Sequence, residues 1–244
     1  MRGPSSFWRR SVVTGEHRVV VTGGTGGLGA GVVRRLLEGG MRPIVTWVVP
    51  AERDRTAATF GAAVDLREVD VLDAGQVAAL AGERDAEGRP WGLVHLVGGY
   101  LDGAPLGEMT PEQWEGQLRL NLTSLAVVLG AFLPGMARRR GGRVVAVSSR
   151  TAVRPFAGGS AYAASKAGVI ALVEAAQREV LAAGVCVNCV LPSVIDTPAN
   201  RAAQPEADHA SWVRPDEIGS VVRFLCSPDA SAVTGAAIPV YGRA

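Results

Sequence analysis

The chain has 244 residues, of which 48% are hydrophobic, so it can bury a large core within one α/β domain. Its net charge is only +2, with 25 basic residues scattered among 23 acids, which excludes the basic surface that nucleic-acid binding requires. No uninterrupted apolar run reaches the ~18 residues of a membrane span. We therefore expect neither nucleic acid nor membrane as a partner, and one domain over residues 17 to 244.

The first sixteen residues differ from the rest, because they carry Arg2, Arg9 and Arg10 and no acid before Glu16. They contain no apolar segment of the kind that signal peptides have. We interpret residues 1 to 16 as a disordered extension. A transit peptide and an over-long start are the alternatives.

The cysteines and histidines suggest no disulfide and no metal. Cys186 and Cys189 form a C-x-x-C inside an apolar stretch typical of a strand, where an odd spacing places them on opposite faces. Cys226 makes the count odd, which suits a reducing compartment, so we predict a cytoplasmic protein. The three histidines lack the spacing of metal ligands, and we expect no metal site.

A glycine-rich turn follows the first expected strand, which covers residues 18 to 21. The sequence T-G-G-T-G-G-L-G at 22 to 29 leads into a helix that ends at Gly39-Gly40. Glycines let the backbone approach a pyrophosphate, whose charge the helix N-terminus stabilises. G-x-G-x-x-G from Gly24 and T-G-x3-G-x-G from Thr22 both fit, and the doubled glycines leave the choice open. A flexible turn without a ligand is the alternative.

Further strand and helix patterns alternate along the chain. Strands are expected at residues 44 to 49, 63 to 69, 93 to 97, 144 to 147, 185 to 191 and 237 to 240. Helices are expected at residues 52 to 60, after Asp73, and at 111 to 139, 161 to 183 and 215 to 226. Asp73 with Gln76, and Thr110 with Gln113, form capping-box patterns. Seven strands alternating with six helices indicate a doubly wound parallel sheet with helices on both faces.

Tyr162 and Lys166 lie one helical turn apart and share a helix face. A nearby ammonium favours phenolate, so we predict that the pKa of Tyr162 lies below its usual value of ~10, where proton exchange at neutral pH becomes feasible. Ser149 follows the strand at 144 to 147, whose end can meet the start of this helix. Lys166 is the only lysine among 25 basic residues, which favours a functional role over an exposed surface pair.

With these motifs the chain resembles the short-chain dehydrogenase/reductase family from Arg18 to Gly242. The resemblance implies a single-domain Rossmann fold that transfers hydride between NAD or NADP and a small alcohol or carbonyl compound. Tyr162 would be the general acid/base, and Ser149 would polarise the substrate oxygen. Lys166 would bind the nicotinamide ribose and lower the tyrosine pKa, and Asn121 would hold a water between Lys166 and solvent.

The same resemblance implies a set of cofactor-binding residues along the chain. They are Thr22, Gly23, Gly27, Leu28, Gly29, Trp47, Asp70, Val71, Gly98, Tyr162, Lys166, Pro192, Val194, Ile195 and Thr197. The resemblance favours the T-G-x3-G-x-G spacing of the glycine turn, and assigns Asp70 and Val71 to the adenine, Val194 and Ile195 to the nicotinamide amide, and Thr197 to the phosphates.

Three positions depart from the family pattern. His95-Leu96-Val97-Gly98 stands where the family usually has Asn-Asn-Ala-Gly, so the side-chain bonds that brace that turn are missing or replaced. Ser193 replaces a glycine after Pro192. Trp47 occupies the place of the acid or base that selects NAD or NADP, so the sequence leaves this choice open, with Arg53 or Arg55 as a candidate phosphate partner.

Two other functions compete with general carbonyl reduction. One is 3-oxoacyl-carrier-protein reduction, with Arg138-Arg139-Arg140 as a basic docking face. The other is a non-catalytic NAD(P)-binding sensor or subunit, which the presence of all four catalytic positions disfavours. The resemblance also implies a homo-oligomer, a dimer or tetramer, built through the helices at 111 to 139 and 161 to 183.

Overall fold

The computed structural model describes residues 17–86 and 91–243, so the predicted extension at residues 1 to 16 lies outside the described residues. Within this part of the chain, seven parallel strands form one sheet in the order β3-β2-β1-β4-β5-β6-β7. The strands are β1 (His17–Thr22), β2 (Met41–Trp47), β3 (Asp65–Glu68), β4 (Trp91–His95), β5 (Gly142–Val147), β6 (Val185–Pro192) and β7 (Ala237–Val240). The predicted doubly wound parallel sheet is confirmed.

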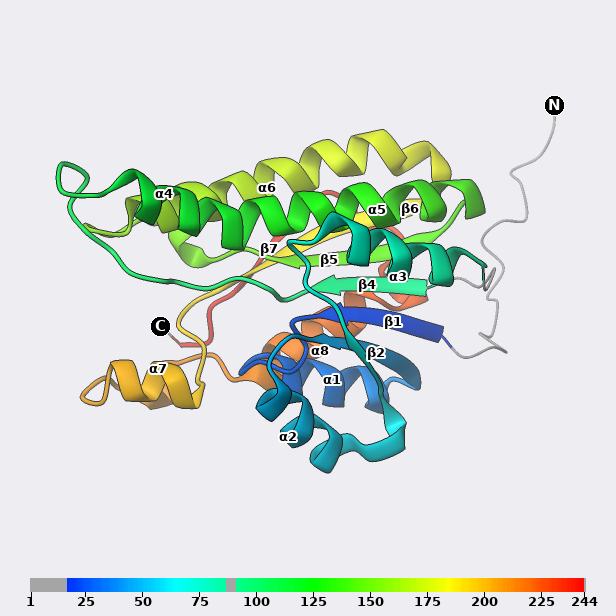
Figure 1. Ribbon diagram of the computed structural model, residues 1–244, viewed down its shortest axis with the longest axis horizontal. Coiled ribbons are helices and arrows are strands. Elements are labelled where there is room, and N and C mark those ends of the chain that lie inside the picture. The colour runs from blue at the N-terminus through cyan, green and yellow to red at the C-terminus, as the bar shows by residue number, and fades with distance from the viewer. Residues whose placement is uncertain (1–16, 87–90, 244) are drawn as a thin grey trace.

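Helices cover both faces of this sheet, with α3, α5 and α6 on one side and α1 and α8 on the other (Figure 1). The helices are α1 (Gly29–Glu38), α2 (Pro50–Phe60), α3 (Ala74–Ala86), α4 (Pro111–Leu118), α5 (Ser124–Arg139), α6 (Ser160–Val180), α7 (Pro198–Ala203) and α8 (Pro215–Leu225). The described residues thus hold two helices more than expected. A π-helical turn over Arg119–Thr123 separates α4 from α5, and α7 begins behind the capping side chain of Thr197.

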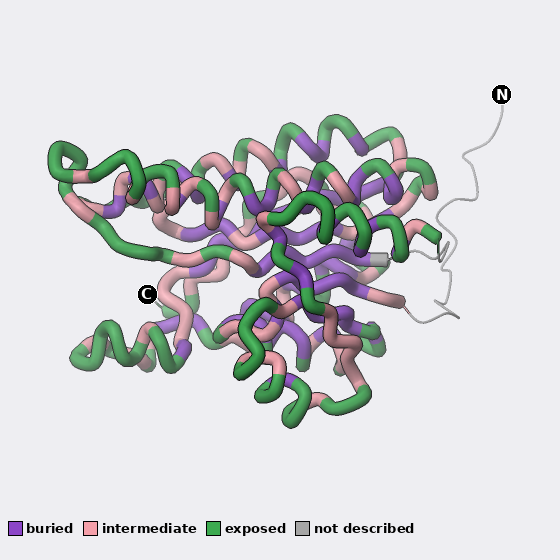
Figure 2. Tube along the Cα trace, viewed as in Figure 1, coloured by how far each residue is buried: buried purple, intermediate pink, exposed green. Residues whose placement is uncertain are grey.

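Each face of the sheet has its own apolar cluster, and buried residues fill the space between the layers (Figure 2). Phe132 and Met136 of α5 belong to the first cluster, together with Cys189 of β6. Cys186 points to the other face, where its Sγ lies 3.6 Å from the carbonyl oxygen of Ser231. The predicted placement of the two thiols on opposite faces is therefore confirmed.

The helical stretch Pro111–Arg139 is apolar enough to cross a membrane by length and composition, with a mean hydropathy of 1.7 over its most apolar window. Half of that window is buried inside the protein. Leu125, Phe132 and Met136 supply much of this buried surface against the sheet. The fold itself therefore covers one side of the helix.

The second strand begins three residues earlier than expected, at Met41 rather than at residue 44. Val48 and Val49 continue the apolar pattern but are 58% and 45% exposed. The reason is Pro50, which occupies the first position of α2 and makes Val49 the extended residue before the helix. Trp47 is therefore the last residue of β2.

One of the two predicted capping boxes is complete. The Gln113 N–H donates to Thr110 Oγ1 at 3.3 Å, and the Thr110 N–H donates to Gln113 Oε1 at 3.0 Å. At Asp73 only the first half forms, with the Gln76 N–H donating to Asp73 Oδ1 at 3.1 Å. The predicted reciprocal bond is wrong, because Gln76 Oε1 accepts from the Asp70 N–H at 2.9 Å instead.

The strand order predicts a binding site at the carboxyl ends of the central strands. The chain runs outward from β1 to β3 on one side and then returns to β4 on the other, so the order reverses between β1 and β4. Their last residues, Thr22 and His95, are register partners. Ligands of such sheets bind beyond the carboxyl ends of the strands at this reversal.

Candidate active site

The glycine turn between β1 and α1 packs closely against the rest of the protein. Gly23 has φ +70°, and a Cβ there would lie 2.9 Å from Val97 Cγ2. A Cβ on Gly27 would lie 3.0 Å from Thr197 Cγ2, and one on Gly29 would collide with the Gly24 carbonyl. A Cβ on Gly24 would lie 2.8 Å from Val45 Cγ1, whereas Gly26 has only an ordinary contact, at 3.4 Å. Gly26 is thus the one glycine of these five that the packing does not require, which favours the spacing T-G-x3-G-x-G over its alternative.

The start of α1 suits a pyrophosphate. Its cap residue, Leu28, makes no side-chain capping bond, and the first turn contains no acid. An anion at this helix N-terminus would be stabilised by unpaired backbone N–H groups and by the positive end of the helix dipole. Thr197, predicted to contact phosphates, lies directly across Gly27. The residues of the turn therefore fit the dinucleotide that the sequence predicts.

Ser149, Tyr162 and Lys166 meet where β5 ends and α6 begins. The Ser148 hydroxyl donates to the Lys166 carbonyl oxygen at 2.7 Å, which ties the strand end to the helix. Lys166 is only 3% exposed, and its Nζ donates to the Val147 carbonyl oxygen at 3.0 Å. The same Nζ lies 5.9 Å from the centre of the Tyr162 ring. The expected meeting of strand end and helix start is confirmed.

The predicted direction of the Tyr162 pKa is wrong for this structure. Burial raises the pKa of Tyr162, and a hydrogen bond with Ser149 lowers it in part. Lys166 does not offset the burial, because its Nζ lies at the ring and bonds to Val147 rather than to the phenol oxygen. Burial also lowers the pKa of Lys166 to about 8. Tyr162 therefore holds its proton at neutral pH.

Asn121 is fully buried in the π-helical turn and anchors the loop after β4. Its Oδ1 accepts from the Gly99 N–H at 2.8 Å, and its Nδ2 donates to Ser165 Oγ at 3.1 Å. A Cβ on Gly98, where φ is +146°, would lie 2.6 Å from Asn121 Oδ1 and 2.8 Å from Lys166 Nζ. The structure thus brings Asn121, Lys166 and Gly98 together. No sequence pattern indicated the π turn, a feature frequent at functional sites.

His95 replaces the missing asparagine brace. Its Nδ1 lies 2.8 Å from Thr22 Oγ1 and its Nε2 lies 3.2 Å from Ser124 Oγ. Since Ser124 donates its own proton to the Leu120 carbonyl oxygen at 2.6 Å, His95 Nε2 is the donor and Nδ1 accepts from Thr22. Burial, assisted by the charge of Lys166, lowers the pKa of His95 to about 3, so the ring is neutral.

The segment after β6 is held by internal hydrogen bonds. Pro192 is the last residue of β6. The Val194 carbonyl oxygen accepts from the Val213 N–H at 3.1 Å, and the Ile195 carbonyl oxygen accepts from Asn200 Nδ2 at 2.8 Å. These bonds fix the predicted nicotinamide segment next to the glycine turn.

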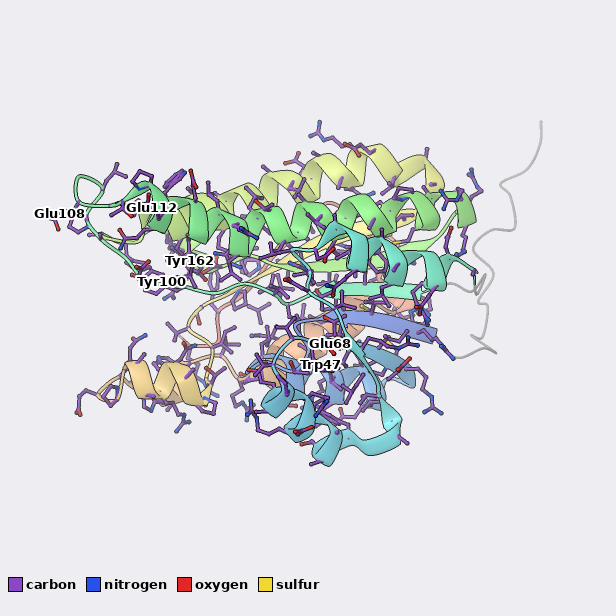
Figure 3. All side chains as sticks on the ribbon, viewed as in Figure 1. Trp47, Glu68, Tyr100, Glu108, Glu112 and Tyr162 are labelled. Carbon is purple, nitrogen blue, oxygen red and sulfur yellow. The ribbon has the colours of Figure 1, made fainter. Side chains whose placement is uncertain are left out.

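The predicted adenosine end lies away from Tyr162, at the carboxyl ends of β2 and β3 (Figure 3). Trp47 is half-buried there, and the Arg53 guanidinium lies 4.9 Å from the centre of its ring. Asp70 is exposed, and its Oδ1 accepts from the Leu72 N–H at 2.9 Å. Val71 is buried in the core. A neutral ring therefore occupies the position from which an acid would bind the ribose diol.

Sequence reasoning missed two groups of residues at this site. Gln117 is buried, and its Nε2 donates to the Gly99 carbonyl oxygen at 2.6 Å. Its spacing to Asn121 and Ser124 on one helix face was a signal that the sequence carried. The other group is Tyr100 with Phe156, whose ring centres lie 5.9 Å apart, and no sequence pattern connects these two positions.

The described residues contain no group of three histidines, cysteines or acids that could hold a metal ion. The three cysteines are buried free thiols. Burial raises the pKa of Cys189 to about 12, although its position near Lys166 acts against this.

Comparison with known proteins agrees with this geometry. The model of the family described as short chain dehydrogenase matches residues 17–208. An acetoacetyl-CoA reductase of Synechocystis sp. is 33% identical over 92% of this chain and 94% of its own length. A 3-oxoacyl-[acyl-carrier-protein] reductase of Vibrio cholerae is 32% identical over 91% and 95%. The solved structure of ElxO with NADP bound has a TM-score of 0.86 at 22% identity, covering 93% of this chain and 98% of ElxO.

Proposed function

Because the chain belongs to the short-chain dehydrogenase/reductase family, and so is an NAD(P)-dependent oxidoreductase acting on C=O or CH–OH groups, we propose that Tyr162 is its general acid/base. Ser149 would polarise the substrate oxygen, and Lys166 would bind the ribose of the nicotinamide. Membership of this enzyme family disfavours the alternative of a non-catalytic sensor.

The observation that carries this proposal is the convergence of the three side chains. Tyr162 bonds to Ser149, and the Lys166 ammonium lies at the Tyr162 ring and next to Gly98. A substrate oxygen that replaces the Ser149–Tyr162 bond can accept from both hydroxyls, which stabilises the negative charge that develops on it. The bound nicotinamide would supply the hydride.

The protonated state of Tyr162 suits reduction. Because burial raises the pKa of Tyr162, the phenol retains the proton that it would donate to a substrate alkoxide. Lys166 and Asn121, which adjoin one another at Gly98, would then return a proton from solvent. We therefore propose that the free enzyme is protonated for the reduction of a carbonyl at neutral pH.

The test is a cofactor turnover assay with the purified protein. NADH and NADPH are each supplied with a panel of small ketones, and absorbance of the reduced nicotinamide is followed. We expect turnover with at least one ketone, abolished in Tyr162→Phe. A protein that binds reduced cofactor but turns over none of the panel would count against the proposal.

Reduction of a 3-oxoacyl thioester is the second candidate, favoured by the names of relatives at 32% and 33% identity. The structure weakens one argument for a carrier protein, because the predicted basic docking run is partly neutralised. Arg138 and Arg139 both pair with Asp85, and Arg140 donates to the Ala182 carbonyl oxygen at 3.1 Å. Acetoacetyl-CoA in the same assay tests this candidate.

We also propose a homo-oligomer, a dimer or tetramer, that resides in the cytoplasm. Ala167 and Ala171 lie exposed on the outer side of α6, and their small side chains would allow helices of two copies to pack closely. Light scattering at micromolar concentration tests the assembly, and a monomer there would reject it. Cell fractionation tests the location, which the three free thiols support.

A further inference from the structure

Three aromatic rings are linked by ring contacts at the candidate active site. Tyr100, in the loop after β4, contacts both of the others: its ring centre is 5.6 Å from that of Tyr162 and 5.9 Å from that of Phe156. The interplanar angles are 76° and 62°, so both contacts are edge-to-face. Figure 3 shows Tyr100 and Tyr162 side by side. We define Tyr100 and Phe156 as the aromatic wall.

The aromatic wall is exposed to an unusual degree. Tyr100 is 49% exposed and Phe156 is 50% exposed, in a chain of which only 5% is aromatic. Exposed apolar side chains are ordinary when they are scattered singly, whereas a contiguous exposed apolar patch marks a binding surface. Leu101 and Val153, also exposed, extend the apolar surface on either loop. The catalytic ring of Tyr162 is continuous with this surface.

Glycines shape the two loops so that the rings can meet. A Cβ on Gly103 would collide with the Tyr100 hydroxyl and with the Gly158 carbonyl oxygen. A Cβ on Gly159 would lie 2.7 to 3.0 Å from three carbon atoms of the Phe156 ring, and Gly158 has φ +81°. The wall is therefore held in place by close backbone packing, while about half of the surface of each side chain stays exposed.

We propose that the substrate carries a flat apolar ring next to its carbonyl group and that the aromatic wall binds this ring, an inference that rests on the proposed function. A carbonyl oxygen placed at Ser149 and Tyr162 brings its neighbouring substituent to Tyr100, the ring adjacent to Tyr162. Flat aromatic groups pack well in offset or edge-to-face contact with such rings. Tyr100 and Phe156 are thus specificity-determining residues.

Charges of both signs lie near the wall. The loop that carries Tyr100 also carries Asp102 and Glu108, and Glu112 follows at the start of α4, whereas the exposed Arg154 precedes Phe156 by two residues. Figure 3 shows Glu108 and Glu112 at the same end of the molecule as Tyr100. The acids would repel the phosphates of a coenzyme A or carrier-protein thioester and Arg154 would attract them, so the rings and not the charges distinguish this substrate class from the second candidate function.

The experiment compares two ketones with equal numbers of heavy atoms, acetophenone and cyclohexyl methyl ketone, in the full-length enzyme. The measured quantity is the ratio of their kcat/KM values, in which any general damage to the catalytic groups cancels. We expect Tyr100→Leu and Phe156→Ala each to lower the phenyl-to-cyclohexyl ratio about five- to tenfold. Tyr100→Leu keeps apolar bulk in the loop, so it retains the fold. Phe224→Ala is the matched control, since Phe224 is a 43% exposed ring on α8 away from the site.

The outcomes separate this inference from the proposed function. A phenyl-to-cyclohexyl ratio that stays unchanged in both wall variants overturns the inference, even if the kcat/KM values of both ketones fall together, because the wall then does not contact the substrate ring. Turnover of acetoacetyl-CoA above both ketones and unaffected by the variants also overturns it, while the reductase function stands. Absence of turnover with these three compounds and with the whole ketone panel removes the proposed function itself.

Discussion

The two ends of the candidate active site are built in different ways. At the reaction end, Asn121, Ser149 and Lys166 are all less than a tenth exposed, and each is hydrogen-bonded to another element or loop. At the adenosine end, Asp70 is exposed and Trp47 has a surface arginine stacked over it. The reaction end therefore depends on the identity of each side chain, because a buried polar group that loses its partner is costly. At the adenosine end, the exposed Asp70 and the half-buried Trp47 can vary without disturbing the core, whereas Val71 belongs to it.

The largest expected effect at the reaction end comes from Tyr162→Phe. The variant keeps the ring and removes only the proton donor, so kcat should fall by about 10²–10⁴-fold while the cofactor Kd changes little. Tyr241→Phe, which removes a hydroxyl from the C-terminal segment, is the control and should behave as wild type. Steady-state kinetics and a cofactor titration decide, and near-normal turnover in Tyr162→Phe would remove this residue from the mechanism.

Lys166→Arg should cost about a hundredfold in kcat/KM even though the charge is kept. The side chain is 3% exposed, and a single added carbon on Gly98 would already lie 2.8 Å from Nζ, so the larger planar guanidinium has no room. Lys166→Ala serves as the comparison, because it removes the charge without crowding. If the arginine variant matched wild type in turnover and cofactor affinity, the buried ammonium would have no role at the reaction end.

The pH dependence should show Lys166 directly. Burial lowers its pKa to about 8, so the ammonium is present below that pH and lost above it. The pKa of Tyr162 is raised, so the phenol stays protonated through this transition. We expect kcat/KM for reduction to fall above pH 8, by up to about tenfold per pH unit, and the residual activity of Lys166→Ala to show no such step. The same step in that variant would assign it to another group.

The smallest expected effect lies at the adenosine end, in Trp47→Asp. A carboxylate at the end of β2 would accept from the ribose hydroxyls of NADH and repel the 2′-phosphate of NADPH. The ratio of kcat/KM for NADH over NADPH should rise about tenfold or more, while the pH profile of the reaction end stays unchanged. Both kcat/KM values are measured from initial rates with the same ketone. An unchanged ratio would show that Trp47 does not face the ribose.

Local patterns predicted most of the frame on which the site is built. The parallel sheet, the glycine turn and the one-turn spacing of Tyr162 and Lys166 follow from hydrophobic runs, backbone sterics and helix periodicity, all of which act over a few residues. The same local rules placed β2 at residues 44 to 49, whereas the strand is Met41–Trp47. The apolar Val48 and Val49 resemble strand residues, but they lead into α2, which begins at Pro50. They also missed the π turn around Asn121, which depends on how the helix meets Gly99.

What the sequence by itself determined is which chemical groups are present and at what spacing: one lysine a helical turn after a tyrosine, a serine at a strand end, and a glycine-rich turn. The tertiary structure decided how those groups behave. Burial acts on Tyr162 more strongly than the nearby ammonium, so the pKa is raised where the spacing alone predicted a lowering. The fold also brought Tyr100 beside the Tyr162 ring and Phe156 beside Tyr100, since contacts between distant loops depend on packing that no local pattern records.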